Sequence, residues 1–240
     1  MHDLKFGVVV FPGSNCDDDL VHVVGEVCKV HTLKIWHKDH KLPDLDGILL
    51  PGGFSYGDYL RSGAIARYAN IMPAIKDFAD QGGFVWGICN GFQILCEAGM
   101  LPGVLLANRD QKFISDNVHL RVQTSNSMIT SALPKGTVLR MPIAHADGRY
   151  YADQEVLDQL IQNDQILFKY CDAEGNPSEA ANVNGSLLNI AGICNIHRNV
   201  YGMMPHPERA SEAMLGNEDG LGLFRSMIHN LVAANPVAGS

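Results

Sequence analysis

The chain has 240 residues and a formal net charge of −8, and 46% of its residues are hydrophobic, which suffices for a full buried core. The acidic balance argues against a general nucleic-acid binder, because phosphate contacts require a basic face. No apolar run is long enough to span a membrane, and no signal peptide is recognisable. The six cysteines form no CxxC pair and lack zinc-finger spacing, so we expect free thiols in a reducing cytoplasm.

The first third of the chain alternates strand-like and helix-like segments. Three short apolar segments are predicted strands, at residues 4–11, 29–36 and 47–50. A helix is expected between the first two, capped by Ser14, Asn15 or Asp17 and extending to about residue 28. A second helix is expected over residues 59–80. This order of elements is typical of an α/β fold with a mainly parallel sheet.

A predicted buried strand over residues 84–88 runs into a predicted helix over 91–98, and Cys89 lies at their junction. Such a sharp turn holds its junction residue in a strained conformation, and the N–H groups and dipole of the helix favour a thiolate there. Gly87 and Gly91 would let backbone pass close on both sides. The pattern predicts a nucleophilic thiol. Most free cysteines are buried structural residues, however, so this motif alone leaves both interpretations open.

The rest of the chain is predicted to be rich in antiparallel β-structure. Its expected elements are β-segments over 104–123 and 138–143, a polar loop over 143–151, a helix over 153–160, a strand over 165–171, an Asn-Gly hairpin turn over 182–186, a hairpin of 190–194 with 200–204, and a closing helix over 219–233. No convincing linker is present. We therefore expect a single domain over residues 1–240, with 231–240 as a loose C-terminal tail.

A cysteine nucleophile needs a base, and the base needs a group that orients it. His206 and Glu208 offer both, because residues two apart share a face in an extended segment and Pro207 favours extended geometry before it. A lone His-x-Glu is more often a surface pair. This pair and Cys89 each follow a predicted strand, however, and the carboxyl ends of parallel strands share one rim. We therefore expect the three side chains to lie together.

Several other positions permit two interpretations. The N–H groups of the Gly52-Gly53 pair could supply an oxyanion donor, or the pair could form only a tight turn. His145 lies in the polar loop, which could bind a ligand or merely face solvent. Cys16 precedes three aspartates, and we interpret it as part of a capped helix start rather than as a metal ligand. Cys96 is expected in the core.

Five motifs stand in a distinctive order along most of the chain. They are FPGSNC at 11–16, GGFSYGD at 52–58, LRSGAIAR at 60–67, CNGFQ at 89–93 and MMPHPER at 203–209. Together they resemble the class I glutamine amidotransferases, and most closely the branch that forms the glutaminase component of phosphoribosylformylglycinamidine synthase. The resemblance implies a flavodoxin-like α/β fold, with helices flanking a mostly parallel central sheet and a smaller antiparallel β segment.

The resemblance also implies roles for individual residues. Cys89 matches the nucleophile, His206 the general base and Glu208 the residue that orients the base. The N–H groups of Gly53 and Asn90 match the oxyanion hole. The implied reaction hydrolyses L-glutamine to glutamate and ammonia through a glutamyl thioester on the cysteine.

Gln93 matches a family position that holds the substrate glutamine. The resemblance implies no metal or nucleotide for this half-reaction. The net charge of −8 and the lack of a long apolar run lead us to expect no nucleic-acid or membrane partner. The resemblance implies two protein partners, which are a small accessory subunit and a synthetase subunit. The synthetase would use ATP and Mg to convert formylglycinamide ribonucleotide to formylglycinamidine ribonucleotide in de novo purine biosynthesis.

The chain departs from the family pattern at two positions. Val183 stands where a proline is expected, and Ser62 stands where a cysteine is common. Three alternatives compete with the resemblance: a glutaminase that feeds another synthase, a peptidase-like cysteine hydrolase, and a module that binds glutamine without cleaving it. The GFSYGD stretch argues against the first, the combination of Gln93 with the His-x-Glu pair against the second, and an intact triad against the third.

Overall fold

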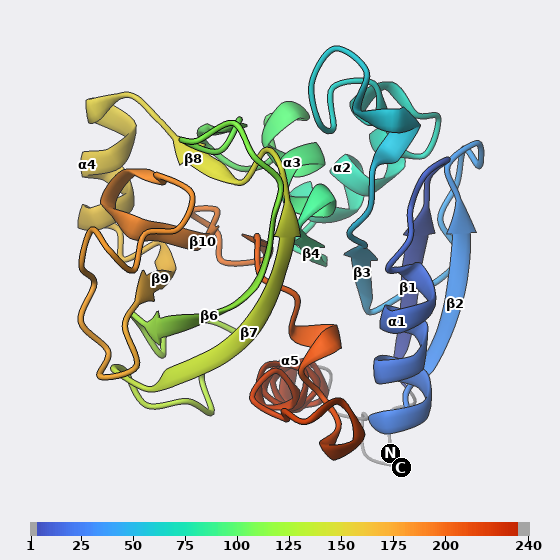
Figure 1. The fold of residues 1–240 in the computed structure, drawn as a ribbon. Helices are drawn as coiled ribbons and strands as arrows, with labels where there is room; N and C mark the ends of the chain where they lie inside the picture. The colour runs from blue at the N-terminus through green and yellow to red at the C-terminus, as the bar shows by residue number, and fades with distance from the viewer. Residues whose placement is uncertain (1–3, 235–240) are drawn as a thin grey trace.

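The computed structural model describes residues 4–234, and within that range its central feature is one sheet of nine strands (Figure 1). In spatial order the strands are β2 (His31–Trp36), β1 (Lys5–Val10), β3 (Gly47–Leu50), β4 (Phe84–Ile88), β11 (Val200–Met203), β10 (Ile190–Cys194), β9 (Ile166–Cys171), β6 (Ile114–Val122) and β7 (Val138–His145). All pairings from β2 to β11 are parallel, and all from β11 to β7 are antiparallel. The predicted α/β fold is confirmed, and the antiparallel segment continues the parallel part of the sheet.

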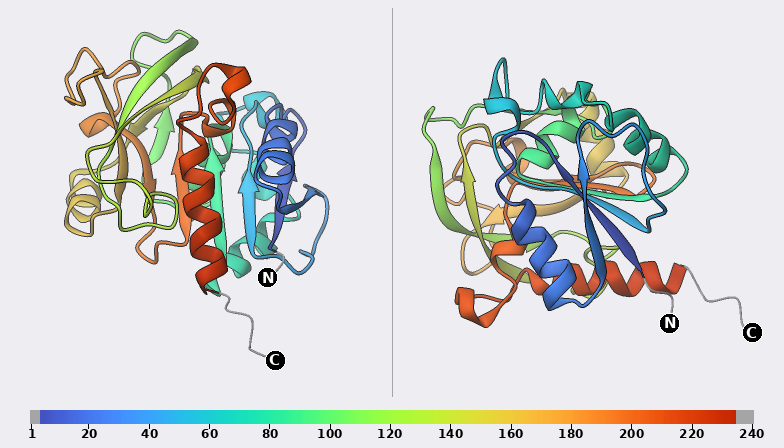
Figure 2. Two further views of the ribbon diagram at one scale, coloured as in Figure 1. Left: turned by 90° about the horizontal axis from the view of Figure 1, so that it is seen from below. Right: turned by 90° about the vertical axis from the view of Figure 1, so that its right-hand side faces the viewer.

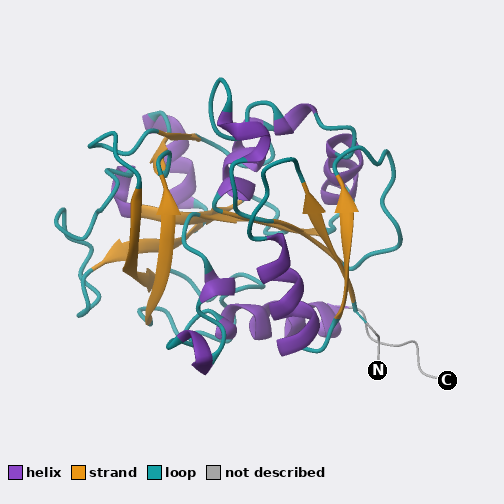
Figure 3. Ribbon diagram, turned by 45° about the vertical axis from the view of Figure 1, so that its right-hand side comes forward, coloured by secondary structure: helices purple, strands orange, loops and turns teal. Residues whose placement is uncertain are grey.

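Helices cover both faces of this sheet (Figure 2, Figure 3). On one face lie α1 (Asp17–Val21), which continues as π-helical turns over His22–Val27, and α5 (Leu221–Ala234). On the other face lie α2 (Met72–Asp80) and α3 (Asn90–Glu97). A two-stranded ribbon pairs β5 (Val104–Leu106) with β8 (Arg149–Tyr151), and α4 (Gln154–Gln162) precedes β9. Short 3-10 turns lie at Ser55–Asp58, Ala66–Tyr68, Leu187–Asn189, Pro207–Arg209 and Ala213–Leu215. Over residues 4–234, no helix is both long and apolar enough to cross a membrane.

The helix predicted over residues 59–80 is wrong in its first half. Leu60 has a φ of 72° and Gly63 a φ of 81°, which a regular right-handed helix cannot contain. A Cβ placed on Gly63 would lie 2.8 Å from the backbone nitrogen of Ile94, so this segment passes directly against α3. The helix begins only at Met72, with Pro73 in its first turn. Close contact with α3, rather than helical propensity, therefore sets the backbone before α2.

Two predicted helix boundaries also differ from the structure. Cys16 occupies the N-cap position of α1 without a side-chain cap hydrogen bond, so the three predicted caps are wrong. The side chain of Ser14 does not cap the helix, because its Oγ accepts a hydrogen bond from the N–H of Phe11 at 3.0 Å. The last helix, α5, includes residues 231–234, so the predicted tail starts too early. Residues 235–240, the rest of that predicted tail, lie outside the described residues.

The predicted polar loop and the predicted Asn-Gly hairpin also need correction. The polar loop shrinks to residues 146–148, because β7 extends to His145 and β8 begins at Arg149. The Asn-Gly turn forms, with a φ of 82° at Gly185, but it lies inside the long connection between β9 and β10. It therefore joins no hairpin.

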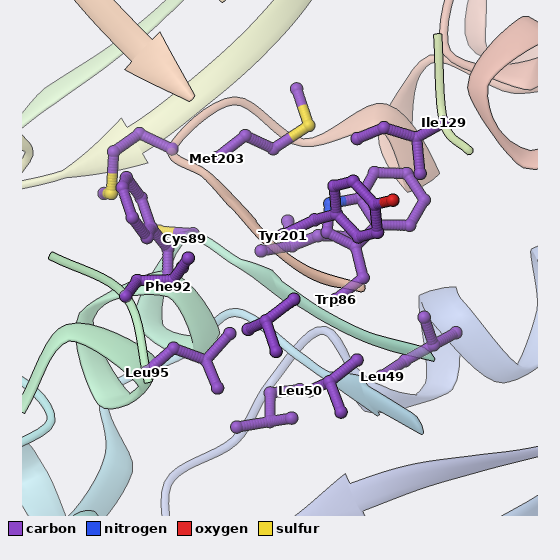
Figure 4. Packing of buried hydrophobic residues seen from close by; sticks show 14 of the residues in the cluster. Leu49, Leu50, Trp86, Cys89, Phe92, Leu95, Ile129, Tyr201 and Met203 are labelled. Atoms are coloured by element: carbon purple, nitrogen blue, oxygen red, sulfur yellow. The ribbon is translucent and has the colours of Figure 1, made fainter. Parts of the chain in front are cut away.

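The core at the centre of the sheet supports the rim on which the candidate residues lie. Figure 4 shows Leu49 and Leu50 of β3, Trp86 of β4 and Tyr201 of β11 packed together, and each is fully buried. Cys89 belongs to the same buried cluster and lies at its edge. Because the parallel strands β3, β4 and β11 end on the same side of this core, the segments that follow them meet at one rim.

The first turn of α3 passes close to β3 and β4 through two glycines. A Cβ on Gly91 would lie 2.0 Å from the carbonyl oxygen of Leu50. A Cβ on Gly87 would lie 2.5 Å from the carbonyl of Gly91. Both obstacles are backbone atoms, which cannot rotate away. The close backbone passage predicted on both sides of Cys89 is therefore confirmed.

We expect Gly91→Ala to lower the free energy of unfolding by roughly 3 kcal/mol or more, because α3 must shift away from the end of β3. Urea unfolding followed by circular dichroism measures this change. Gly25→Ala is the matched control, since its Cβ would meet only ordinary contacts at 3.8 Å and beyond. We expect no loss of stability in the control, and equal losses in both variants would contradict the close-packing argument.

Candidate active site

Cys89 lies at the turn between β4 and α3 in a strained conformation. Its φ of 51° and ψ of −108° fall in a region that residues other than glycine rarely occupy. Its N–H donates to the carbonyl oxygen of Met203 at 2.8 Å, which ties this turn to the end of β11. The thiol lies 3.8 Å from the carbonyl oxygen of Ala144 on β7. The strained junction predicted from the sequence is confirmed.

His206 and Glu208 form a buried pair directly after β11. Nδ1 of His206 donates to Oε1 of Glu208 at 2.6 Å, and the two residues are 1% and 2% exposed. Over residues 4–234, the other ring nitrogen, Nε2, has no hydrogen-bond partner in its buried position. Burial by itself lowers the pKa of His206. The Glu208 carboxylate and the thiols of Cys89 and Cys16 outweigh burial and hold the pKa well above its ordinary value of 6.5.

The His-Glu pair forms by a different geometry from the one predicted. Pro207–Arg209 is a 3-10 turn with His206 at its N-cap, so the segment is not extended. Proline suits the first position of a helical turn, because its φ is preset and its missing N–H is not needed there. The N–H of His206 donates to the carbonyl oxygen of Pro142 at 2.9 Å, which anchors the turn to β7. The two side chains therefore meet across a tight turn instead of along one strand face.

The glycine pair after β3 lies against the same group. A Cβ on Gly52 would lie 2.7 Å from Cε1 of His206 and 3.4 Å from Cβ of Cys89. Gly53 has a φ of 144° and opposes Ser14 in a β-bridge whose hydrogen bonds are made by the neighbouring residues. The N–H of Gly53 therefore takes no part in that bridge. The loop is more than a tight turn, since its backbone contacts the His206 ring.

Asn90 and Gln93 extend the site along the first turn of α3. Asn90 is the first residue of this helix, so its N–H has no acceptor within the helix. The Nδ2 group of Asn90 donates to Oε1 of Gln93 at 2.9 Å, and Nε2 of Gln93 donates to the carbonyl oxygen of Asp147 at 2.6 Å. Gln93 is only 4% exposed. Hydrogen bonds thus hold its amide in place between α3 and the loop after β7.

A second thiol near the site was missed by the sequence analysis. Sγ of Cys16 lies 3.9 Å from Nδ1 of His206 and accepts a hydrogen bond from Nη2 of Arg209 at 3.1 Å. Burial raises the pKa of Cys16. The residue follows the first predicted strand, so the rule that parallel strands share a rim could have found it. Cys96 is buried on α3, as predicted.

Cys16, His206 and Glu208 also offer three potential metal ligands. Among residues 4–234, their ligand atoms lie within 4.8 Å of one another. Two of these atoms already share a short hydrogen bond, and the guanidinium of Arg209 lies against the thiol. A cation would have to displace the proton and compete with the arginine charge, so this donor set suits a metal poorly.

Two half-buried carboxylates lie beside this site. The hydroxyl of Ser62 donates to Oδ2 of Asp147 at 2.8 Å and also contacts the carboxylate of Asp58. Nδ2 of Asn90 lies 3.5 Å from Oδ1 of Asp58. Burial raises the pKa of Asp58, the hydroxyl of Ser62 partly offsets this, and the charge of Asp147 adds to it, giving a pKa of about 6. Asp58 lies in the GGFSYGD motif and Asp147 in the predicted polar loop, but no role had been predicted for either carboxylate.

His145 is neither a solvent-exposed loop residue nor part of a loop at all. It is the last residue of β7 and is 2% exposed. Its Nδ1 lies 3.1 Å from Oδ1 of Asn108, whereas its buried Nε2 has no partner among residues 4–234. Burial and the charge of His206 lower the pKa of His145 to about 4. The ring is therefore neutral at physiological pH.

We expect Asp58→Asn to raise the free energy of unfolding at pH 7 by about 1 kcal/mol. The folded chain binds the Asp58 proton more tightly than the unfolded chain, whose carboxyl has a pKa of 3.8. Ionisation therefore destabilises the folded state as the pH rises from about 4 to about 6. Urea unfolding at pH 4 and pH 7 measures the effect, which should shrink at the lower pH.

Asp77→Asn is the matched control for this measurement, because Asp77 is an exposed carboxylate on α2. Its substitution removes the same charge without removing a buried one. A gain in stability that is equal in the two variants at pH 7 would refute the assignment of the effect to Asp58.

Comparison with known proteins places this geometry in a family. The model of the CobB/CobQ-like glutamine amidotransferase domain matches residues 3–220. The chain is 53% identical over 225 residues to the phosphoribosylformylglycinamidine synthase subunit PurQ of Koribacter versatilis, covering 94% of this chain and 97% of that protein. It is also 53% identical over 235 residues to the protein of the same name from Acaryochloris marina, covering 98% and 100% of the two chains.

Solved structures support the same fold. A chain in the structure of PurLQS from Thermotoga maritima is 42% identical with a TM-score of 0.85, covering 95% of this chain and 99% of that one. A glutamine amidotransferase from the same organism has a TM-score of 0.63 at 14% identity, covering 97% of this chain and 99% of that one. The second likeness concerns the fold alone.

Proposed function

Because this chain belongs to the glutamine amidotransferase family, we propose that it is the glutaminase subunit of a phosphoribosylformylglycinamidine synthase. The observation that carries the chemistry is the meeting of Cys89 with the buried His206–Glu208 pair at one rim of the sheet. The identity of the acceptor reaction rests on the near full-length similarity to the PurQ subunits. We propose that the reaction takes place in the cytoplasm, in keeping with the free thiols.

We assign Cys89 the role of nucleophile toward the side-chain amide carbon of L-glutamine. His206 accepts the thiol proton at Nε2, the ring nitrogen that has no other partner over residues 4–234. Glu208 accepts the Nδ1 proton and thereby fixes the tautomer and orientation of the ring. The high pKa of His206 favours the charged imidazolium, which supports a thiolate beside it.

Attack on the amide produces an oxyanion that needs preorganised donors. We assign this role to the backbone N–H groups of Gly53 and Asn90, which are free of the β-bridge and of helix α3 respectively. Collapse of the intermediate expels ammonia with a proton from His206 and leaves a glutamyl thioester on Cys89. Water, deprotonated by the same imidazole, then hydrolyses the thioester to glutamate. Gln93 is assigned to substrate binding.

We propose that the ammonia passes to a synthetase subunit that forms a complex with this chain and with a small accessory subunit. In the synthetase, ATP and Mg would activate formylglycinamide ribonucleotide for capture of ammonia, giving formylglycinamidine ribonucleotide. The name of the related Thermotoga maritima structure, PurLQS, supports such an assembly. The glutaminase half-reaction itself needs no cofactor in this proposal, because the residues assigned above supply nucleophile, base and oxyanion donors.

The direct test is the release of glutamate from glutamine by the purified chain, alone and together with its synthetase, accessory subunit, ATP and formylglycinamide ribonucleotide. We expect strong stimulation by these additions. In the complex, Cys89→Ala should abolish product formation from glutamine but leave product formation from added ammonia unchanged. Cys96→Ala, which removes a buried thiol from the same helix, is the control and should retain both activities. Glutamine-dependent activity in the Cys89 variant would show that another residue is the nucleophile.

Glu208→Gln should lower glutamine-dependent turnover by roughly 10²- to 10⁴-fold, because the neutral amide no longer stabilises the imidazolium or fixes its tautomer. Steady-state kinetics of the complex with glutamine measure this loss, and ammonia-dependent turnover provides the internal reference. Glu218→Gln alters an exposed glutamate elsewhere and should leave both rates unchanged. If both variants behaved like the unsubstituted chain, Glu208 would not be the orienting residue.

A further inference from the structure

Beside the thiol, hydrogen-bond acceptors outnumber donors. The carboxylates of Asp58 and Asp147 both contact the hydroxyl of Ser62. A hydroxyl has one proton and can serve only one carboxylate at a time. The amide of Asn90 donates one N–H at 2.9 Å to Gln93, and its contact to Asp58 is a long one of 3.5 Å. The two carboxylates are therefore short of donors.

Within residues 4–234, no cationic side chain neutralises these acids. Over residues 4–234, neither Asp58 nor Asp147 forms an ion pair with a lysine, arginine or histidine. Among residues 4–234, Asp147 is the one charged group that acts on the pKa of Asp58, and it raises that pKa. Two half-buried carboxylates of like charge without a counter-charge destabilise the free protein. A bound cation would remove this cost.

An independent feature at the end of β7 also calls for an N–H donor. Oδ1 of Asn108 accepts the N–H of Gly148 at 3.0 Å, so this oxygen is an acceptor and Nδ1 of His145 must donate to it. Nε2 of the neutral imidazole is then an acceptor, and it is buried without a partner among residues 4–234. A Cβ on Gly148 would lie 2.2 Å from the ring, so the imidazole packs against the loop that carries Asp147.

The segment that carries His145 and Asp147 contacts both the reacting thiol and helix α3. The carbonyl oxygen of Ala144, next to His145, lies 3.8 Å from Sγ of Cys89. Gln93, one helical turn beyond the thiol, donates to the carbonyl oxygen of Asp147 at 2.6 Å. In glutamine, three carbon atoms separate the reacting amide carbon from the α-nitrogen. A substrate whose amide lies at the thiol therefore carries its α-ammonium into the neighbourhood of the acids.

We propose that Asp58 and Asp147 bind the α-ammonium of the substrate glutamine, with Nε2 of His145 as a third acceptor. This inference rests on the proposed glutaminase function and adds to it how the site would select glutamine over other amides. An ammonium group has three N–H donors and one positive charge, which supplies both the donors and the counter-charge that this part of the site lacks. Amides without an α-ammonium would leave the carboxylates unpaired and would be poor substrates.

The test compares glutamine with glutaramate, which is glutamine with hydrogen in place of the α-ammonium. Glutaminase kinetics of the complete synthase complex give kcat/KM for each amide. We expect Asp58→Asn to lower kcat/KM for glutamine by about 10- to 100-fold, mainly through KM, and to leave that for glutaramate nearly unchanged. The ratio of the two values should therefore fall by the same factor. Asp147→Asn should lower this ratio in the same way. Asp77→Asn, the exposed control, should leave the ratio unchanged.

Each outcome of this experiment decides the proposal. An unchanged ratio in both Asp58→Asn and Asp147→Asn, or equal losses on both amides, would overturn it, because a purely structural role affects the two substrates alike. A third outcome would also overturn the proposal. If ammonium chloride inhibited the complex, and Asp58→Asn relieved this inhibition without changing the ratio of kcat/KM for the two amides, the acids would bind product ammonium instead. If the unsubstituted complex released no glutamate, the proposed function itself would fail, and the inference with it.

Discussion

The parallel pairing of β4 with β11 is the interaction on which the site depends. The two strands are far apart in the sequence, yet their register sets Met203 opposite Ile88, and the next N–H, that of Cys89, donates to the carbonyl oxygen of Met203. The nucleophile and the His206 turn therefore start from the same point of the sheet. The buried aromatic core beneath them, which includes Trp86, holds that point fixed. A change in strand register would separate base and nucleophile without altering any catalytic side chain.

The sequence allowed the strands of the parallel half and the turn at Cys89 to be predicted, because their apolar runs and flanking glycines are local signals. The loop over 59–65 was mispredicted as helix because its conformation follows from contact of Gly63 with α3, which no local pattern encodes. The contact between His206 and Glu208 was predicted correctly, but the extended segment from which it was predicted is a 3-10 turn in the structure. Proline at position 207 is compatible with both an extended segment and the first turn of a helix, and only the tertiary position decides between them.

The parts of the site that sequence reasoning missed are residues whose motif or loop was recognised without a role being predicted for the side chain. Cys16, Asp58 and Asp147 lie on three separate loops, and their proximity depends on how these loops fold over the rim. His145 was placed in a loop because its neighbours are polar, whereas β7 continues through it and buries its ring. Amidotransferase chemistry could thus be inferred from the sequence, but the balance of donors and acceptors around the thiol could not.

The edge strand β7 contacts the catalytic residues although it lies far from β4 in the pairing order. In the pairing order β7 is five positions from β4, so a flat sheet would separate the two strands by roughly 24 Å. Yet β7 provides the carbonyl oxygens of Ala144 and Pro142, which contact Cys89 and His206. The antiparallel half must therefore curl back toward the rim, as Figure 1 shows for β6 and β7. The pairing of β9 with β10 is irregular around Gly192, and such bulges increase local twist. The curvature of the sheet thus brings β7 against Cys89 and His206, and a force that flattened the antiparallel half would pull β7 away from both residues.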